Sequence, residues 1–167
     1  RQTAIQDPQR RFTDNEISFV GYMLGDGTIT NGNLSFSQTS NEIRENFISV
    51  VHGIGGNCTE VLSDEKAPYV RVFRNKSESP MILLHDLGLM NKLAPEKFVP
   101  KNMLTMPAAQ TCLLLSALWE TDGSVSTFTE TRKNGNTSLH ARIAYVSRSE
   151  QLCQDVQTLL LRLGMNS

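Results

Sequence analysis

A segment of six residues occurs twice in this chain of 167 residues. Residues 25–30 read GDGTIT and residues 121–126 read TDGSVS. Both copies have a small residue, Asp, Gly, a hydroxyl residue, a β-branched residue and a second hydroxyl residue. The two aspartates, Asp26 and Asp122, are 122 − 26 = 96 positions apart. Internal similarity of this kind indicates a fold built from two related units.

The similarity continues on both sides of the repeated segment. An apolar run with helical spacing precedes each copy, and a second helical pattern follows it. These four stretches are residues 16–24, 112–120, 40–57 and 149–166. Ser40 and Ser149 are expected N-caps of the later pair, and Gly55 and Gly164 are their expected ends. Each unit is therefore predicted to begin helix, strand, strand, helix.

The two later helices are 149 − 40 = 109 positions apart, which is 109 − 96 = 13 more than the aspartates. We expect the additional residues in a loop within 127–138, which contains ETRKNGNTS. The first unit continues with predicted strands at about 58–62 and 69–73 and a helix at about 77–87. The chain reaches Ser167 where the equivalent strands should begin, so the second unit is expected to lack its final strands and helix.

This organisation divides the chain into three parts. Residues 1–12 are expected to be a linker or leader, residues 13–98 the first unit and residues 99–167 the incomplete second unit.

The predicted strands alternate between apolar and polar side chains, so each has two different faces. The apolar sets are Val70 with Val72, Leu34 with Phe36, and Ile143 with Tyr145; the opposing polar sets are Arg71, Ser35 with Ser37, and His140 with Arg142. A sheet with one Arg/Ser/His face suits a DNA groove. The alternative is an antiparallel sheet with one face in water.

The net charge of −1 does not by itself indicate a nucleic-acid binder. The bases are clustered, however, with three in residues 69–76 and four in residues 124–148, where Glu130 is the sole acid. The alternative is a solvated surface of mixed charge. No apolar run approaches the roughly 20 residues of a membrane span, and the stretch after Arg1 lacks the apolar core of a secretion signal.

The three cysteines are an odd number without a C-x-x-C pair. This favours reduced, buried thiols in an intracellular protein, cytoplasmic or in the nucleoid.

Each repeated aspartate stands at the end of an apolar helix, where the negative end of the helix dipole disfavours a carboxylate. Small residues one turn apart, Gly21 and Gly25 in one helix and Ala117 and Thr121 in the other, would let the two helices pack closely. Asp26 and Asp122 would then lie together and repel, unless a cation such as Mg²⁺ lies between them. For a single Asp-Gly, the alternative is a turn starter.

The first helix and its aspartate resemble the signature motif of the LAGLIDADG homing endonucleases. In FVGYMLGDG (19–27), Gly21 and the final Asp-Gly match the motif, with Gly25 in place of Ala. In LSALWETDG (115–123), Leu115, Leu118 and the final Asp-Gly match, with Glu120 in place of an Asp. The resemblance covers residues 13–167. It implies an α+β, LAGLIDADG homing-endonuclease fold with a pseudo-twofold αββαββα repeat, whose second copy is truncated here.

The stretch EKFVPKNML (96–104) resembles the Lys-x-x-Pro block before the second motif of intein-borne members, with Lys97 and Pro100 at matching positions. The resemblance places Lys97 near the scissile phosphate, where it would stabilise charge or help to activate water. The alternative is a solvated loop lysine.

The resemblance implies a site-specific double-strand DNA endonuclease that hydrolyses phosphodiesters with Mg²⁺, or Mn²⁺ in its place. Asp26 and Asp122 would hold the metal together with the carbonyls of Gly25 and Thr121. A monomer with pseudo-twofold symmetry would bind a long DNA site. The expected DNA contacts are Ser35, Ser37, Gln38, Arg71, Arg74, Lys76, Arg132, Lys133, His140, Arg142 and Arg148.

The splicing residues of an intein are not at the ends of this chain. Arg1 is no nucleophile, and Asn166-Ser167 aligns with Asn57-Cys58 in mid-chain. We therefore expect the endonuclease portion of an intein, or part of one, separated from its splicing domain and host protein. Alone it is expected to cleave poorly or not at all, whereas a complete form is expected to cleave. The alternatives are a maturase, a degenerate endonuclease that binds without cleaving, and an insert with a structural role.

Overall fold

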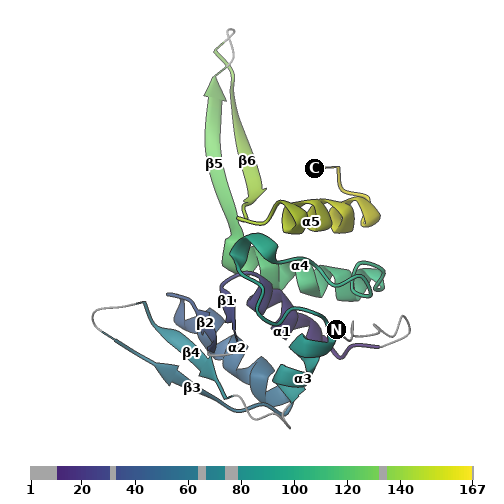
Figure 1. The fold of residues 1–167 in the computed structure, drawn as a ribbon. Helices are drawn as coiled ribbons and strands as arrows, with labels where there is room; N and C mark the ends of the chain where they lie inside the picture. Colours follow the sequence, from purple (N-terminus) through teal and green to yellow (C-terminus); the bar gives the residue numbers. More distant parts are fainter. Residues whose placement is uncertain (1–10, 31–32, 64–66, 74–78, 132–134, 167) are drawn as a thin grey trace.

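The computed structural model describes residues 11–30, 33–63, 67–73, 79–131 and 135–166, which form the expected α+β fold (Figure 1). The helices are α1 (Asp14–Leu24), α2 (Asn41–Gly53), α3 (Ser79–Asp86), α4 (Ala108–Asp122) and α5 (Glu150–Arg162), with a 3₁₀ turn η1 (Ala94–Glu96). The strands are β1 (Gly27–Ile29), β2 (Leu34–Ser37), β3 (Cys58–Val61), β4 (Tyr69–Val72), β5 (Gly123–Thr131) and β6 (Thr137–Tyr145). None of the helices in these ranges is long and apolar enough to cross a membrane.

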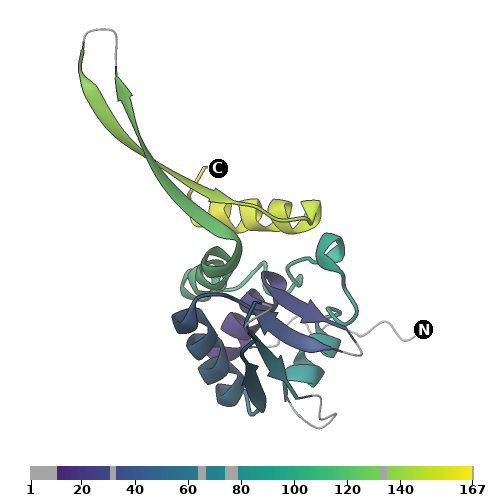
Figure 2. The same ribbon diagram turned by 90° about the vertical axis from the view of Figure 1, so that its left-hand side faces the viewer.

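Helices α1 and α4 form the centre of the molecule. In both Figure 1 and Figure 2 they lie between the sheet of β1–β4 and the hairpin of β5 and β6. Every residue of α1 from Ile17 to Leu24 is buried, because packing surrounds this helix on all sides. A capping box begins the helix: the backbone N–H of Glu16 donates to Thr13 Oγ1, and the backbone N–H of Thr13 donates to Glu16 Oε2.

Helices α2 and α5 begin and end as predicted. Ser40 and Ser149 are their N-caps, and each side chain accepts a hydrogen bond from the backbone N–H three residues later. Gly55 and Gly164 follow the two helices with φ angles of 76° and 81°, in the left-handed region that favours glycine. The two helices are amphipathic and each contributes buried apolar side chains to the core.

The strands of the first unit form one antiparallel sheet in the order β1-β2-β4-β3. The apolar face of this sheet carries Leu34, Phe36, Val70 and Val72, all buried, as the alternation predicts. Phe36 stacks on Phe47 of α2 with ring centroids 4.4 Å apart. Helix α2 therefore covers the apolar face and leaves the opposite face with Arg71 exposed.

The two hairpins have the same register. Gly27 pairs with Phe36 and Thr28 with Ser35, while Gly123 pairs with Tyr145 and Ser124 with Ala144. The first strands are offset by 123 − 27 = 96 positions and the second strands by 145 − 36 = 109. These are the offsets of the sequence repeat, so the repeat corresponds to equivalent strand pairing.

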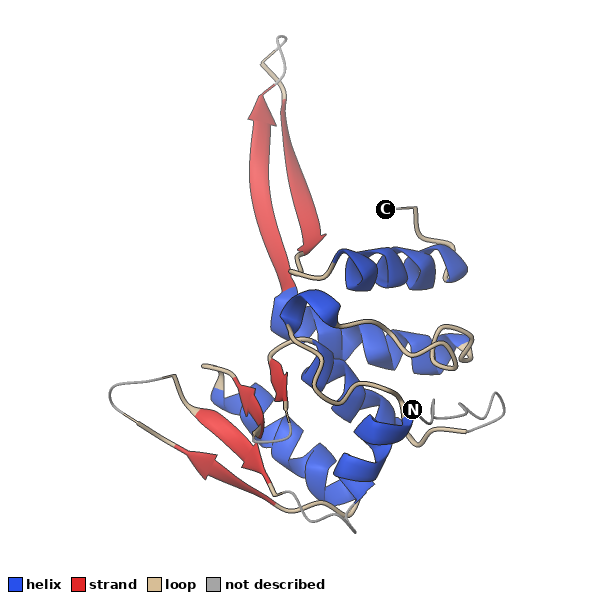
Figure 3. Cartoon of the chain, viewed as in Figure 1, coloured by secondary structure: helices blue, strands red, loops and turns tan. Residues whose placement is uncertain are grey.

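The loop expected within 127–138 is shorter than predicted, because residues 127–131 and 137–138 belong to strands; residues 132–134 lie outside the described ranges. Strands β5 and β6 pair through Thr127↔Ala141 to Thr131↔Thr137, well beyond the pairs shared with the first hairpin. The additional residues therefore lengthen the hairpin, and Figure 3 shows it extending away from the helices as a two-stranded arm. Alternating Thr and Ser residues in this stretch are compatible with strands, and the sequence analysis undervalued them.

The expectation of buried cysteines is also wrong. All three cysteines are free, but Cys112 is exposed on α4, and Cys58 and Cys153 are half-buried. The apolar core is supplied instead by large aliphatic and aromatic side chains from α1, α2, α4 and the first sheet.

Candidate metal centre and nucleic-acid interface

Helices α1 and α4 approach closely where their residues are small. A Cβ atom added to Gly21 would lie 2.6 Å from Ala117 Cβ, and one added to Gly25 would lie 2.5 Å from Thr121 Cβ. The Thr121 hydroxyl donates within its own helix, to the carbonyl of Leu118 at 2.9 Å, so it does not separate the helices. The four residues expected at a helix interface therefore lie against one another in two pairs.

A polar contact that the sequence analysis missed joins the same two helices. The hydroxyl of Tyr22 donates to Glu120 Oε2 at 2.6 Å. Burial, with a smaller contribution from this carboxylate, raises the pKa of the Tyr22 hydroxyl. Since these residues are 98 positions apart, only the pairing of the two helices could have indicated the contact.

Asp26 and Asp122 occupy equivalent places at the ends of these helices. The backbone carbonyl of Asp26 accepts from the N–H of Ser37, and that of Asp122 accepts from the N–H of Val146, both at 3.2 Å. Burial and the charge of Asp122 raise the pKa of Asp26 to about 6, against the opposing effect of Lys97. Burial also raises the pKa of Asp122. The charge of Asp122 thus disfavours ionisation of Asp26.

This donor set fits a divalent cation. Two half-buried carboxylates that repel one another are stabilised when a cation neutralises both, and oxygen ligands suit Mg²⁺ or Mn²⁺. Within the described ranges, His, Cys, Asp and Glu form no cluster of three that could hold a metal. A cation at Asp26 and Asp122 would therefore draw its remaining ligands from carbonyls such as those of Gly25 and Thr121, and from water or substrate.

Lys97 lies beside this pair and is not a solvated loop residue. Its side chain is buried, with 4% of the residue exposed, and Nζ donates to the carbonyls of Gly25 and Gly27, both at 2.8 Å. Burial lowers the pKa of Lys97 to about 8, although the charges of Asp122 and Asp26 oppose the change. A cavity of about 280 Å³ next to it is lined by Gly25, Lys97, Asp122 and Arg148, among others.

Helix α5 and its N-cap hold the backbone that follows the Lys97 side chain. Ser149 Oγ, fully buried, donates to the carbonyl of Lys97 at 2.6 Å. The N–H of Val99 donates to Asp155 Oδ2 at 2.8 Å, and Asp155 is itself buried. Sequence reasoning found Ser149 only as an N-cap and did not single out Asp155. An acidic residue among the apolar positions of α5 was the available signal.

Gln38 faces the metal centre rather than open solvent. Its Nε2 donates to Asp26 Oδ2 at 3.0 Å, and its Oε1 accepts from the backbone N–H of Thr39 at 2.8 Å. The amide expected to contact DNA therefore also contacts the Asp26 carboxylate.

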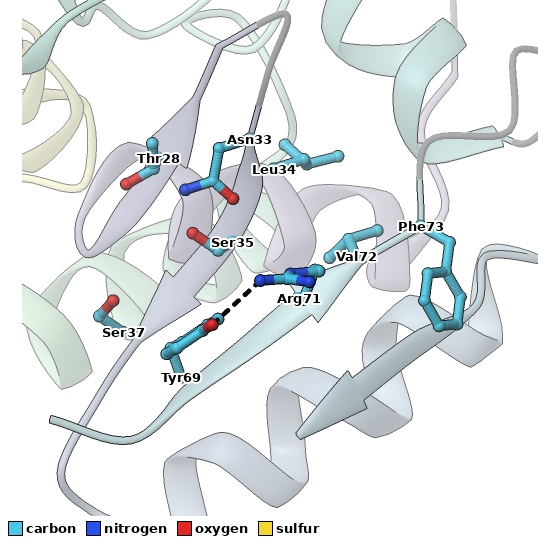
Figure 4. Close-up of a pocket in the computed structure, with 9 residues that line it drawn as sticks. All are labelled: Thr28, Asn33, Leu34, Ser35, Ser37, Tyr69, Arg71, Val72 and Phe73. Atoms are coloured by element: carbon cyan, nitrogen blue, oxygen red, sulfur yellow. Dashed lines mark hydrogen bonds between the residues drawn. The ribbon is translucent and has the colours of Figure 1, made fainter. Parts of the chain in front are cut away.

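The polar face of the first sheet is concave around Arg71. Thr28, Ser35, Arg71 and Thr59 lie in one row across the four strands, since each pairs with the next. A cavity of about 530 Å³ opens over this face, and Figure 4 shows its lining residues, with Arg71 directed along the strand toward Tyr69. Ser37 lies at the margin of this face and is exposed, whereas Ser35 is nearly covered.

The second polar face belongs to the long hairpin. His140 stacks on Phe128 with ring centroids 5.3 Å apart, and the Arg142 guanidinium lies 5.7 Å from the Phe128 centroid. His140 Nε2 is 3.3 Å from Glu130 Oε2. Arg148 is exposed beyond this hairpin. Four of the expected DNA contacts, Arg74, Lys76, Arg132 and Lys133, lie outside the described residues.

Comparison with known proteins identifies relatives of this fold. Residues 109–167 match the family model described as a LAGLIDADG-like domain. A mesophilic variant of the homing endonuclease I-DmoI aligns over 92% of this chain and 78% of its own, with a TM-score of 0.52 and 12% identity. I-DmoI in complex with DNA and Mn aligns over 92% of this chain and 81% of its own, with a TM-score of 0.50 and 12% identity. At this identity the likeness shows the fold.

Three curated relatives are replicative DNA helicases DnaB. Those of Synechocystis sp. and Nostoc sp. are each 28% identical, over 93% and 95% of this chain, and that of Rhodothermus marinus is 27% identical over 93%. The chain spans only 18%, 18% and 17% of their lengths.

Proposed function

We propose that this chain, a member of the LAGLIDADG family, is a site-specific double-strand DNA endonuclease that hydrolyses phosphodiesters with a divalent metal held by Asp26 and Asp122. The observation that carries the proposal is the pair of equivalent aspartates at the meeting ends of α1 and α4, beside a buried lysine. A purely structural helix pair gains nothing from two repelling carboxylates, whereas a metal-dependent nuclease requires them.

Each residue of the centre has a separate task in this proposal. A divalent cation supplies activation of the attacking water and stabilisation of the leaving oxygen. Gln38 fixes the orientation of the Asp26 carboxylate through its 3.0 Å hydrogen bond. Close packing at Gly25 and Thr121 sets the distance between the two helix ends. Lys97, whose pKa of about 8 leaves it mostly protonated at neutral pH, adds a positive charge next to the scissile phosphate.

We propose Mg²⁺ as the resident cation, with Mn²⁺ as an alternative. The oxygen ligands offered by Asp26, Asp122 and neighbouring carbonyls suit either ion. The I-DmoI complex with DNA and Mn supports divalent metal use on this fold.

The two polar sheet faces are proposed to bind a long stretch of duplex DNA. Arg71 lies on one, and His140 and Arg142 lie on the other. Basic groups supply affinity through phosphates, and groups that reach base edges supply specificity. The projecting hairpin of β5 and β6 would extend the contact along the duplex.

The chain is further proposed to be the endonuclease portion of an intein inserted in a host protein, with the splicing domain and host as its partners. Support comes from the DnaB helicases, in which a region equivalent to almost the whole of this chain makes up less than a fifth of the protein. An inserted element accounts for a LAGLIDADG-like domain within a helicase sequence.

Cleavage of a supercoiled plasmid tests the proposed function. The plasmid carries a DnaB coding sequence joined across the position of the inserted region, and a control plasmid lacks that junction. Wild-type protein with Mg²⁺ is expected to nick or linearise the first plasmid only, and to do so slowly, because this chain alone is expected to cleave poorly; prolonged incubation at high protein concentration is therefore part of the assay. Asp26→Asn and Asp122→Asn should lose cleavage and retain binding. Binding without cleavage by the wild type would contradict an endonuclease and favour a maturase or a degenerate insert.

A further inference from the structure

Arg71 occupies the middle of the polar face of the first sheet. Its strand, β4, is flanked by β2 and β3, and its row neighbours across the sheet are Ser35 and Thr59. The major groove of DNA admits β strands, and side chains on strands that enter it reach base edges. The position of Arg71 thus favours contact with base edges.

Tyr69 holds the Arg71 side chain in one orientation. Arg71 Nη2 donates to the Tyr69 hydroxyl at 3.1 Å, and the guanidinium carbon lies 5.8 Å from the centroid of the same ring. Figure 4 shows the two side chains lying along β4 and joined by this bond. A guanidinium fixed in this way loses less conformational freedom on binding than a free arginine does.

The guanidinium keeps most of its donors available. The guanidinium has five N–H groups. Among the described residues, it donates only to Tyr69, and no carboxylate there forms a salt bridge with it. Its neighbours in the row, Ser35 and Thr59, are neutral hydroxyl residues, so none of the residues paired with Arg71 neutralises its positive charge. The 530 Å³ cavity over this face leaves room for the edge of a base pair.

We propose that Arg71 is a specificity-determining residue that reads a guanine in the major groove, with Tyr69 as the residue that positions it. Guanine presents two acceptors there, O6 and N7, which match the guanidinium fork in a bidentate contact. No other base offers this pair. The inference rests on the proposed function, because it requires that the sheet binds DNA.

The test is selection of bound duplexes from a randomised library, followed by sequencing, for the wild type and Arg71→Lys. Lysine keeps the charge and loses the fork. The wild type is expected to require guanine at one position of its site, and Arg71→Lys to lose that preference while keeping the others. On the selected duplex, its dissociation constant should rise roughly 5- to 150-fold. Affinity for an unselected duplex should not change.

Two further variants sharpen the result. Tyr69→Phe keeps the ring and removes the hydroxyl, so it should weaken the same guanine preference and no other. Lys101→Gln removes a positive charge from an exposed loop position outside both sheets and should leave every base preference unchanged. Circular dichroism spectra of all variants should match that of the wild type, since Arg71 and Lys101 are exposed.

Other outcomes overturn the inference in distinguishable ways. In one such outcome, Arg71→Lys keeps the guanine preference. In the same outcome, Arg71→Gln weakens binding to all duplexes equally, and the slope of log affinity against log salt concentration becomes smaller by about one. Arg71 then contacts a phosphate, and the proposed function still stands. If the wild type binds no duplex at low salt, the proposed function fails.

Discussion

Asp155 on α5 accepts a buried hydrogen bond from the backbone N–H of Val99, two residues after the buried Lys97. The two residues are 56 positions apart, and the bond ties the first residue of the second unit to α5. Together with the bond from Ser149 to the carbonyl of Lys97, it fixes the backbone from which the lysine reaches Gly25 and Gly27.

Asp155→Ala is therefore expected to destabilise the protein and to release Lys97. Loss of the carboxylate leaves the Val99 N–H buried without an acceptor, which costs about 1–3 kcal/mol in the free energy of unfolding. Urea denaturation measures this loss. Gln154→Ala, at an exposed position on the same helix, should change the free energy of unfolding by less than about 0.5 kcal/mol.

Acetylation of Lys97, followed by mass spectrometry, should be faster in Asp155→Ala than in the wild type. An unchanged rate would show that Asp155 does not position the lysine.

Gly21→Ala is expected to separate α1 from α4, because the new methyl group would overlap Ala117. Overpacking of this kind costs about 1–3 kcal/mol in the free energy of unfolding. The double variant Gly21→Ala/Ala117→Gly, which removes the opposing methyl group, should recover part of this loss. Ser116→Ala on the exposed side of α4 is the control. Equal stability of the single and double variants would show that the two residues do not limit the helix distance.

The metal-free protein should lose stability as the pH rises from about 4 to 7. The pKa of Asp26 is about 6 in the folded protein, above its ordinary value of 3.8, so the folded state binds this proton more tightly than the unfolded state. Stability is therefore greatest below the unfolded value and falls as the folded carboxyl ionises. Melting temperatures in EDTA across this range measure the effect, and Asp26→Asn should flatten the profile.

Mg²⁺ should reverse that loss near pH 7 and have little effect near pH 4.5. A cation binds the ionised pair of carboxylates and stabilises the folded state by RT ln(1 + [Mg²⁺]/Kd). The measurement compares melting temperatures with and without Mg²⁺ at the two pH values. If Mg²⁺ raised the melting temperature of the double variant Asp26→Asn/Asp122→Asn by the same amount, the cation would bind elsewhere.

Leu34 and Ile143 are equivalent in the two hairpins but are expected to respond differently to truncation. Leu34 is fully buried and Ile143 is 66% exposed, although the register gives them the same place in each unit. Leu34→Ala should lower the free energy of unfolding by about 2–5 kcal/mol, and Ile143→Ala by less than about 1 kcal/mol. Urea denaturation provides both values. Similar losses would mean that the hairpin face is covered in solution.

The repeat made much of the fold predictable. The four strands and three helices of the first unit, and the helices that flank the second hairpin, follow from periodicity, N-capping serines and terminating glycines. The hairpin extension was not predictable in this way, because a segment rich in Thr, Asn and charged residues is compatible with both a loop and an exposed strand. Pairing across the hairpin decides between them, and it is a non-local property.

The candidate centre was predictable only in part for the same reason. Asp26 and Asp122 stand in a repeated motif, but Gln38, Tyr22 and Asp155 act through partners distant in the sequence or across a turn. Local sequence cannot distinguish a glutamine that reaches DNA from one that orients a carboxylate.

Lengthening of the second hairpin has a consequence for how such proteins diversify. The extra residues enter beyond the last pair that the two hairpins share, so Gly123 and Tyr145 keep the pairing that Gly27 and Phe36 have. Arm length is thereby uncoupled from the chemistry at the helix ends. Insertions or deletions at the hairpin tip can change how far the protein reaches along a bound polymer, and do so without moving either aspartate.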